Sequence, residues 1–259
     1  MSGWASQLMI LPIVLPLAAG ATMVLLGEQR RPAKAALGIA STVALLCVSA
    51  LLLWRADGPG PVAGVYRLGD WPAPFGIVLV VDRLSAIMVM LASVLGLASL
   101  VFSLASWHRA GPHFHPLLQF LLMGLNGAFL TGDVFNLFVF FEILLASSYG
   151  LALYGAGIAR VRAGLHYIAV NLAASLLFLI GAGLLYGAAG TLNMADLAAR
   201  LPVLAPGDRA LFEAGAAILG TAFLVKAGMW PLGFWLAPTY AAASPPAAAV
   251  FAIMSKVGV

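Results

Sequence analysis

Long apolar stretches separated by short polar connections make up most of the chain. A helix that crosses a bilayer needs about 20 mostly apolar residues. On that template the seventh stretch is interrupted and the eighth is incomplete. The sequence therefore predicts an all-α, polytopic transmembrane helix bundle with about eight spans, at residues 7–26, 34–54, 77–106, 116–132, 134–155, 163–189, 211–240 and 246–259.

The composition supports a membrane protein and argues against most soluble classes. Of the 259 residues, 63% are hydrophobic and 8% are charged, whereas soluble domains carry about 25% charged residues. The single cysteine, Cys47, leaves no disulfide framework or thiolate metal site. Because no nucleotide-binding or nucleophile motif occurs, we expect no cofactor, no resident metal and no enzyme activity. No basic, aromatic-bearing polar surface predicts nucleic-acid binding.

Charge differs between alternate connections along the chain. The connections at 55–76 and 190–213 balance basic residues with acidic ones. The connections at 28–34, 107–115 and 159–164, called the basic connections below, are short and hold one acid, Glu28, against a set of basic residues: Arg30, Arg31, Lys34, Arg109, Arg160 and Arg162. Basic residues in short loops favour the cytoplasmic side. The pattern predicts that the N-terminus lies outside.

Three ionisable residues fall inside predicted spans, namely Glu142, Lys226 and Lys256. Glu142 lies about eight residues into the fifth span, which is about 12 Å deep at 1.5 Å per residue. A charge at the centre of a spanning helix costs about 2.5–3.5 kcal/mol on insertion scales. Such residues are functional candidates by default, and the alternative is a structural ion pair or a side chain that extends to the interface.

The seventh span carries signals of a broken helix near residues 226–240. Pro231 follows Lys226 by five residues, and Gly228 and Pro238 lie on either side of that proline. Proline removes a backbone donor and clashes with the preceding turn. Irregular backbone at membrane depth is tolerated only beside protein or a water-filled cavity. We therefore expect a break just after Lys226, where the lysine can gain and lose a proton, as in the broken helices of ion-coupled transporters.

Three stretches carry a family resemblance: FNLFVFFEILLASSYGL (135–151), AGLHYIAVNLAASLLFLIGAGLLYGAAGTLNMADLA (163–198) and KAGMWPLGFWLAPTYAAASPPAAAVFAIMSK (226–256). The chain resembles the antiporter-like subunits shared by Mrp/Pha-type multisubunit monovalent cation/proton antiporters and respiratory complex I. Its sequence is most similar to the D subunits of the antiporters. The motif GTLNMADLA and the 30-residue interval between Lys226 and Lys256 are the most specific parts of this resemblance.

The resemblance implies an architecture of about fourteen spans, in which two inverted five-helix repeats follow three leading helices. Residues 1–112 would be the leading helices and residues 113–259 the first repeat, incomplete at its C-terminal end. Because the last apolar stretch ends without a flanking loop, we expect the chain to be a fragment of a longer subunit. The implied location is the inner membrane of a bacterial cell.

The resemblance also implies roles for individual residues. Glu142 corresponds to the glutamate of the family's fifth span, Lys226 to its broken-helix lysine and Lys256 to the lysine that passes protons onward. Tyr240 stands where many relatives of the complex I type have histidine, a departure that weakens that assignment. His166 lies near a position that is often lysine, which implies an accessory polar role.

One further residue is assigned from the sequence itself. Asp133 follows the fourth span directly and is expected to cap the next helix. Together with His166 and Tyr240, it is a candidate for an accessory role in proton translocation.

Three functions remain open at this stage. The leading hypothesis is an ion-translocating subunit that moves protons through Glu142, Lys226 and Lys256 in exchange for Na+ or K+, together with partner subunits in the lipid bilayer. The second is a proton-pumping subunit of a complex I-like assembly or membrane hydrogenase. The third is a scaffold without transport activity, whose buried charges only fix helix register and the docking of partner subunits.

Overall fold

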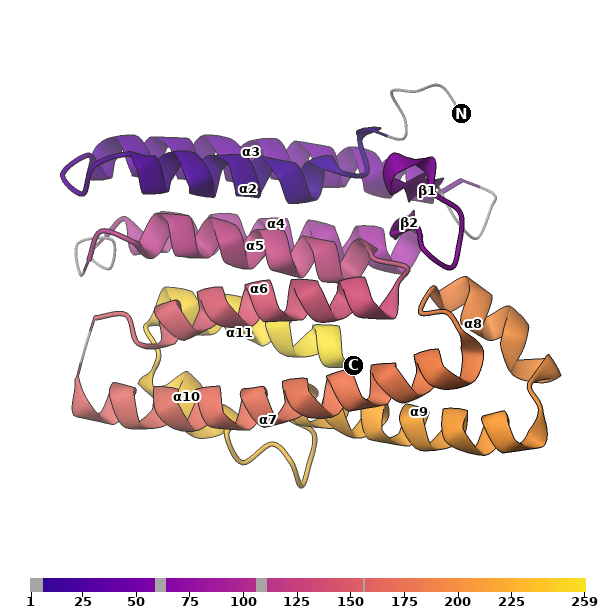
Figure 1. Cartoon of the computed structure of the whole chain (residues 1–259). Coiled ribbons are helices and arrows are strands. Elements are labelled where there is room, and N and C mark those ends of the chain that lie inside the picture. The colour runs from indigo at the N-terminus through magenta and orange to yellow at the C-terminus, as the bar shows by residue number, and fades with distance from the viewer. Residues whose placement is uncertain (1–6, 59–63, 106–110, 156) are drawn as a thin grey trace.

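The computed structural model describes residues 7–58, 64–105, 111–155 and 157–259, and most of them lie in helices that run side by side (Figure 1). Two short strands, β1 (Gly64–Arg67) and β2 (Val78–Val81), form an antiparallel hairpin at one end. The helices are α2 (Leu11–Leu25), α3 (Arg31–Ala56), α4 (Arg83–Ser103), α5 (Phe114–Leu130), α6 (Val134–Ala152), α7 (Ile158–Ala189), α8 (Met194–Arg200), α9 (Pro206–Ala227), α10 (Leu236–Ala242) and α11 (Pro245–Met254).

Five of these helices are long and apolar enough to cross a membrane, namely α3, α4, α6, α7 and α9. Two shorter apolar helices, α2 and α5, lie among them and complete the predicted series up to the broken helix. The prediction of a polytopic helix bundle is therefore confirmed. The predicted eighth span differs, because α11 has 10 residues and continues into a 3-10 turn, Ser255–Gly258. At 1.5 Å per residue, α11 is about 15 Å long, which is half the hydrocarbon thickness.

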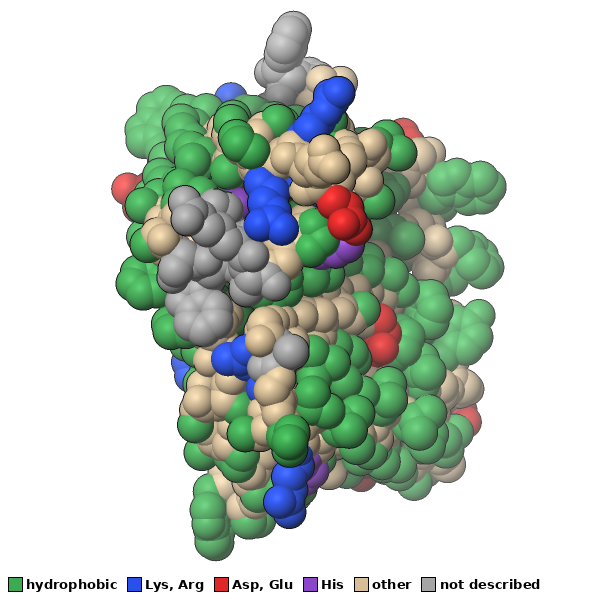
Figure 2. Space-filling model, turned by 90° about the vertical axis from the view of Figure 1, so that its left-hand side faces the viewer, with side chains coloured by type: hydrophobic (Ala, Val, Ile, Leu, Met, Phe, Trp, Pro, Cys, Tyr) green, Lys and Arg blue, Asp and Glu red, His purple; other side chains and the backbone are tan. Residues whose placement is uncertain are grey.

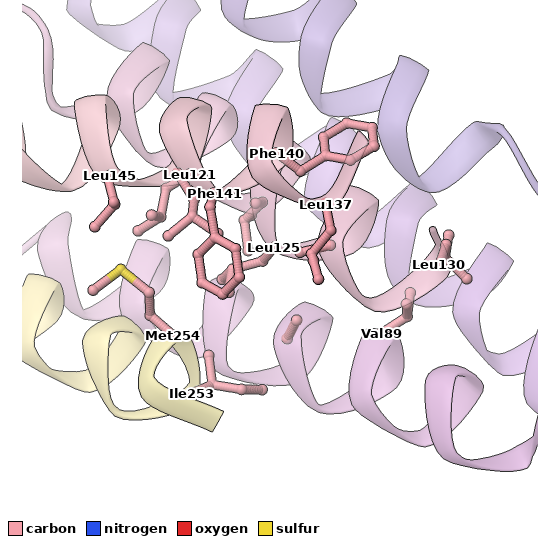
Figure 3. Close-up of a cluster of buried hydrophobic side chains, with 14 of the residues drawn as sticks. Val89, Leu121, Leu125, Leu130, Leu137, Phe140, Phe141, Leu145, Ile253 and Met254 are labelled. Atoms are coloured by element: carbon pink, nitrogen blue, oxygen red, sulfur yellow. The ribbon is translucent and has the colours of Figure 1, made fainter. Parts of the chain in front are cut away.

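The helices pack in successive layers, from α2 and α3 through α4, α5 and α6 to α7 and α9 (Figure 1). The core between them is apolar, because the spanning helices turn their large side chains toward one another. Figure 3 shows one part of this core, where Leu125 of α5, Phe141 of α6 and Met254 of α11 meet. This packing holds α6 in the interior of the bundle, and α6 carries Glu142.

The hairpin is a feature that the hydropathy pattern does not reveal. The third span is predicted from residue 77, but residues 78–81 form strand β2, and helix α4 begins only at Arg83. The run Val-Leu-Val-Val is rich in β-branched residues, which favour a strand as much as a buried helix. Asp82 then starts the helix through a capping box, in which its carboxylate accepts a hydrogen bond from the Ser85 amide at 2.7 Å.

Asp133 lies in the tight turn between α5 and α6 and caps α6, as predicted. Its carboxylate accepts a hydrogen bond from the Asn136 amide at 2.8 Å, which caps α6. The Asn136 side chain donates to the hydroxyl of Thr131 at 2.9 Å and closes the turn. Burial raises the pKa of the Asp133 carboxyl, and the Asn136 amide opposes that shift. Asp133 thus has a structural role at the start of α6.

The basic connections lie together at one end of the bundle, on the left in Figure 1 and facing the viewer in Figure 2. Arg30 precedes α3, and Arg160 and Arg162 lie in the first turns of α7, so all three belong to this end, whereas the hairpin and α8 lie at the other. Lys34 differs from these, since it is 2% exposed and its Nζ atom lies 3.4 Å from the carbonyl oxygen of Pro112. Arg109, also predicted here, lies outside the described residues.

Candidate functional site

The structure brings Glu142 and Lys226 together through a third residue, Ser175. Glu142 lies in the middle of α6, Lys226 in the last turn of α9, and Ser175 in the middle of α7. The ammonium of Lys226 donates a hydrogen bond to Ser175 Oγ at 3.0 Å, and the Ser175 hydroxyl donates to the Glu142 carboxylate. Lys226 is 4% exposed, Ser175 is 5% exposed and Glu142 is half-buried. The acid, the hydroxyl and the amine thus form one chain of hydrogen bonds whose serine and lysine are buried.

Glu142 and Lys226, both among the described residues, do not form a direct ion pair. Within the described ranges the carboxylate–cation pairs are Arg83–Asp57, Arg200–Asp196 and Arg209–Glu213, all near helix ends. Glu142 and Lys226 are separated by 84 residues in the sequence, so only the fold brings them together. A single hydroxyl therefore separates the negative group from the positive one.

One aromatic ring lies against the ammonium group of Lys226. Its Nζ atom lies 4.9 Å from the centre of the Phe141 ring, next to Glu142 in the chain. Phe141 in turn packs against Phe178 and Phe223, with ring centres 6.1 and 6.3 Å away. A ring face attracts a cation without neutralising it. The Phe141 ring therefore stabilises the charge while leaving the Ser175 hydroxyl as its hydrogen-bond acceptor.

The predicted helix break is confirmed and lies directly after Lys226. Helix α9 ends at Ala227, and Gly228 has the left-handed φ of 67° that glycine adopts without strain. The amides of Gly228 and Met229 bond to the last carbonyls of α9, and Trp235 Nε1 donates to the carbonyl of Val225 at 3.0 Å. Protein groups thus satisfy backbone that would otherwise be unpaired at membrane depth.

Both prolines of the predicted break lie where the helix is interrupted or restarts. Pro231 lies between α9 and α10, and Pro238 lies in the first half of α10. Lys226 consequently occupies a helix C-terminus, where the unpaired carbonyls carry partial negative charge and favour a cation.

A row of buried polar side chains on α7 extends from the site toward the basic end. Tyr167, Asn171 and Ser175 recur every four residues and so share one face of the helix. The hydroxyls of Tyr167 and Ser148 lie 2.7 Å apart, and the Tyr149 ring packs edge-on against Tyr167 at 5.3 Å. This row was not predicted from the sequence. The pattern that could have revealed it is the four-residue spacing of polar residues within an otherwise apolar helix.

The remaining candidates lie away from the Glu142–Ser175–Lys226 chain. His166 is exposed beside Phe234, with the ring centres 5.6 Å apart, and borders a hollow of about 940 Å³ between α7 and α10. The Tyr240 hydroxyl donates to the carbonyl of Phe251 at 2.6 Å and ties α10 to α11. Lys256 is exposed in the 3-10 turn that follows α11. No group of three or more His, Cys, Asp or Glu side chains with metal-site geometry occurs among the described residues.

The arrangement has the chemistry of a proton relay. A carboxylate, a hydroxyl and an amine can each accept and release a proton, and here each is within hydrogen-bond distance of the next. An intramembrane carboxylate and lysine facing the bundle interior are typical of ion and proton pathways.

Comparison with known proteins agrees with this chemistry. Residues 131–259 match the family described as NADH:quinone oxidoreductase/Mrp antiporter, transmembrane. The chain is 62% identical over 262 residues to the D subunit of a probable K(+)/H(+) antiporter of Rhizobium meliloti (strain 1021), covering 100% of this chain and 49% of the relative. It is 40% identical over 257 residues to the D subunit of the Na(+)/H(+) antiporter of Alkalihalophilus pseudofirmus, covering 98% and 51%.

The fold gives the same relationship. A chain in the structure of the Mrp complex from Dietzia sp. DQ12-45-1b matches with a TM-score of 0.88 and 32% sequence identity, over 100% of this chain and 47% of that one. The chain spans about half the length of the curated relatives that it matches. It is a multi-pass membrane protein, its residues 131–259 match the NADH:quinone oxidoreductase/Mrp antiporter transmembrane family, and over its whole length it is similar to the D subunits of cation/proton antiporters.

Proposed function

We propose that the chain is the ion-translocating part of a membrane subunit in a multisubunit monovalent cation/proton antiporter. Protons move through Glu142, Lys226 and Lys256 in exchange for Na+ or K+. The main observation in support of the proposal is the chain of hydrogen bonds from Lys226 through Ser175 to Glu142. The names of relatives that are 62% and 40% identical, D subunits of K(+)/H(+) and Na(+)/H(+) antiporters, support the same function.

In this mechanism the charge state of Lys226 depends on Glu142. A proton that reaches the site is held on the amine or the carboxylate, which are joined through the Ser175 hydroxyl. Its release proceeds toward Lys256 and, through partner subunits, is coupled to cation efflux. Residues 113–259 then act as most of the first antiporter repeat, with residues 1–112 as leading helices.

The proposed location is the inner membrane of a bacterial cell, with the N-terminus outside. The supporting observation is that the basic connections share one end of the bundle (Figure 2). Basic residues in short loops are retained in the cytoplasm, so the hairpin and α8 face outward.

The test uses the full-length subunit assembled with its partners in everted membrane vesicles. Proton-coupled exchange is measured as the collapse of a pH gradient when NaCl or KCl is added, normalised to the amount of assembled complex. Glu142→Gln and Lys226→Ala are each expected to lower exchange by about a hundredfold, since each removes a proton-carrying group. Glu213→Gln is the matched control, because it neutralises an exposed carboxylate of α9 that pairs with Arg209. Full exchange by both buried-site variants would contradict the proposal.

The scaffold hypothesis gives a different result in the same assay. If the buried charges only fixed helix register, the variants would reduce the amount of assembled complex and leave exchange per complex intact.

A complex I-like role is the second candidate, because the matching family includes NADH:quinone oxidoreductase subunits as well as Mrp antiporters. It predicts that the native complex purifies with redox subunits that absorb as flavin or iron–sulfur centres. An antiporter complex shows no such absorbance.

A further inference from the structure

We propose that Ser175 is the residue that couples Glu142 to Lys226, with its hydroxyl carrying the proton between the two groups. This inference deepens the proposed function and rests on it. The sequence places the two charged residues in the membrane, but it gives no means of contact between them. The structure supplies one, because Ser175 Oγ accepts from the Lys226 ammonium and donates to the Glu142 carboxylate.

The hydrogen bonds of Ser175 differ from those of other hydroxyls in the spanning helices. Serine and threonine in apolar helices usually donate to a carbonyl one turn earlier in the same helix. Ser93 bonds to Val89 and Ser147 to Ile143 in this way, at 2.7 and 2.9 Å. The hydrogen bonds of Ser175 instead join α7 to two other helices, one to Glu142 of α6 and one to Lys226 of α9. Its hydroxyl is therefore used between helices and not within one.

The position of α7 allows one hydroxyl to reach both partners. Helix α7 lies between α6 and α9 and packs closely on α9, where Gly181 and Gly215 face each other. Small residues at a helix–helix contact let the backbones approach. Ser175 lies six residues before Gly181, so its side chain is held near the end of α9 that carries Lys226.

The proposed step balances in atoms and charge. One proton leaves Lys226 Nζ for Ser175 Oγ while the original hydroxyl proton leaves Oγ for the Glu142 carboxylate. The N–H and O–H bonds that break are replaced by an O–H bond on serine and an O–H bond on the acid. An ammonium and a carboxylate become a neutral amine and a neutral acid, and no electrons are transferred to or from another group.

The step suits an apolar environment, because the net charge of the site is zero before and after it. A transfer that left one uncompensated charge among apolar side chains would be far more costly. A hydroxyl is needed because the described groups contain no direct ion pair between Glu142 and Lys226. Ser175 is thus a positioning and relay residue for both groups.

The experiment compares Ser175→Ala, Ser175→Thr and Ser147→Ala in the full-length subunit within the assembled complex. Exchange is measured in everted vesicles between pH 6 and pH 9 and normalised to assembled complex, with about tenfold loss expected for Ser175→Ala. The pH of half-maximal exchange is expected to shift by about half a unit or more in that variant, because the acid and the amine lose their shared partner. Ser175→Thr keeps the hydroxyl and is expected to restore most of the rate. Ser147→Ala removes a hydroxyl that serves only its own helix, and it is expected to leave the rate unchanged.

The outcomes separate the two proposals. If Ser175→Ala keeps both the rate and the pH profile while Glu142→Gln and Lys226→Ala abolish exchange, the role of Ser175 is overturned and the proposed function stands. If all three retain exchange, both are overturned. Ser175→Val replaces the alanine variant if the latter assembles poorly, since its side chain fills the space of threonine and has no proton to donate. Full exchange by Ser175→Val would likewise overturn the relay.

Discussion

Asn126 shows how one side chain can supply a hydrogen bond that a proline removes from a helix inside the membrane. It is fully buried in α5, and its Nδ2 atom donates a hydrogen bond to the carbonyl of Pro12 in α2 at 2.9 Å. The residue four positions after Pro12 is Pro16, which has no N–H to donate. Because no solvent reaches a carbonyl at this depth, another protein group must bond to it. Asn126 is that group.

This hydrogen bond predicts that Asn126 and Pro16 are energetically coupled. Asn126→Leu is expected to lower the free energy of unfolding by about 1–3 kcal/mol, since it leaves the Pro12 carbonyl unsatisfied. In a Pro16→Ala background the new backbone amide bonds to that carbonyl, so the same change is expected to have a smaller effect. The double-mutant cycle is measured by denaturant titration of the purified full-length protein in detergent. Equal losses in both backgrounds would show that the two residues act independently.

At the scale of elements, the contact between α7 and α9 sets the geometry of the candidate site. A Cβ atom on Gly181 would lie 2.8 Å from the Leu219 amide nitrogen and 2.9 Å from the Gly215 carbonyl oxygen. These are backbone atoms, which cannot rotate away as a side chain can. The two helices therefore approach this closely only because both positions lack a side chain.

We expect Gly181→Ala to move α9 away from α7 and to break the hydrogen bond between Lys226 and Ser175. Exchange per assembled complex should fall by about tenfold. Gly183→Ala is the matched control, because a Cβ atom there would meet nothing within 4 Å. Both variants replace a glycine of the same helix, so helix propensity changes equally in the two. Equal exchange by both variants would rule out this contact as a determinant of the site.

The same elements show what the sequence could and could not predict. The break after Lys226 was predictable, because Gly228 and Pro231 act on their own backbone. The bridge by Ser175 was not, because a serine in an apolar helix looks the same whether it bonds within its helix or across to another. The hairpin was missed because a short β-branched run fits a strand and a buried helix equally well.

At the scale of the whole molecule, the charged ends of the bundle predict its orientation. The basic end holds the connections at 28–34 and 159–164, and the opposite end holds α8 and the start of α9. Because basic loops tend to be retained in the cytoplasm, we expect the second end to lie outside.

Single cysteines test this orientation after the native Cys47 is replaced by alanine. Gly207→Cys, at the start of α9, is expected to react with a membrane-impermeant maleimide on intact cells. Gln29→Cys, in the basic connection, is expected to react only after the membrane is permeabilised. Both positions are exposed, so accessibility within the protein does not limit labelling. The opposite labelling pattern would reverse the orientation.

The hydroxyl between Glu142 and Lys226 also limits the order of events in a turnover. Before a transfer its hydrogen points to the carboxylate, and afterwards the hydrogen received from lysine points back to the amine. The hydrogen bonds of the bridge are then reversed, and a second proton cannot follow in the same direction until the Cβ–Oγ bond of serine rotates. In the proposed relay, proton transfer would therefore alternate with rotation about the Cβ–Oγ bond of Ser175, and each rotation would allow one proton to pass.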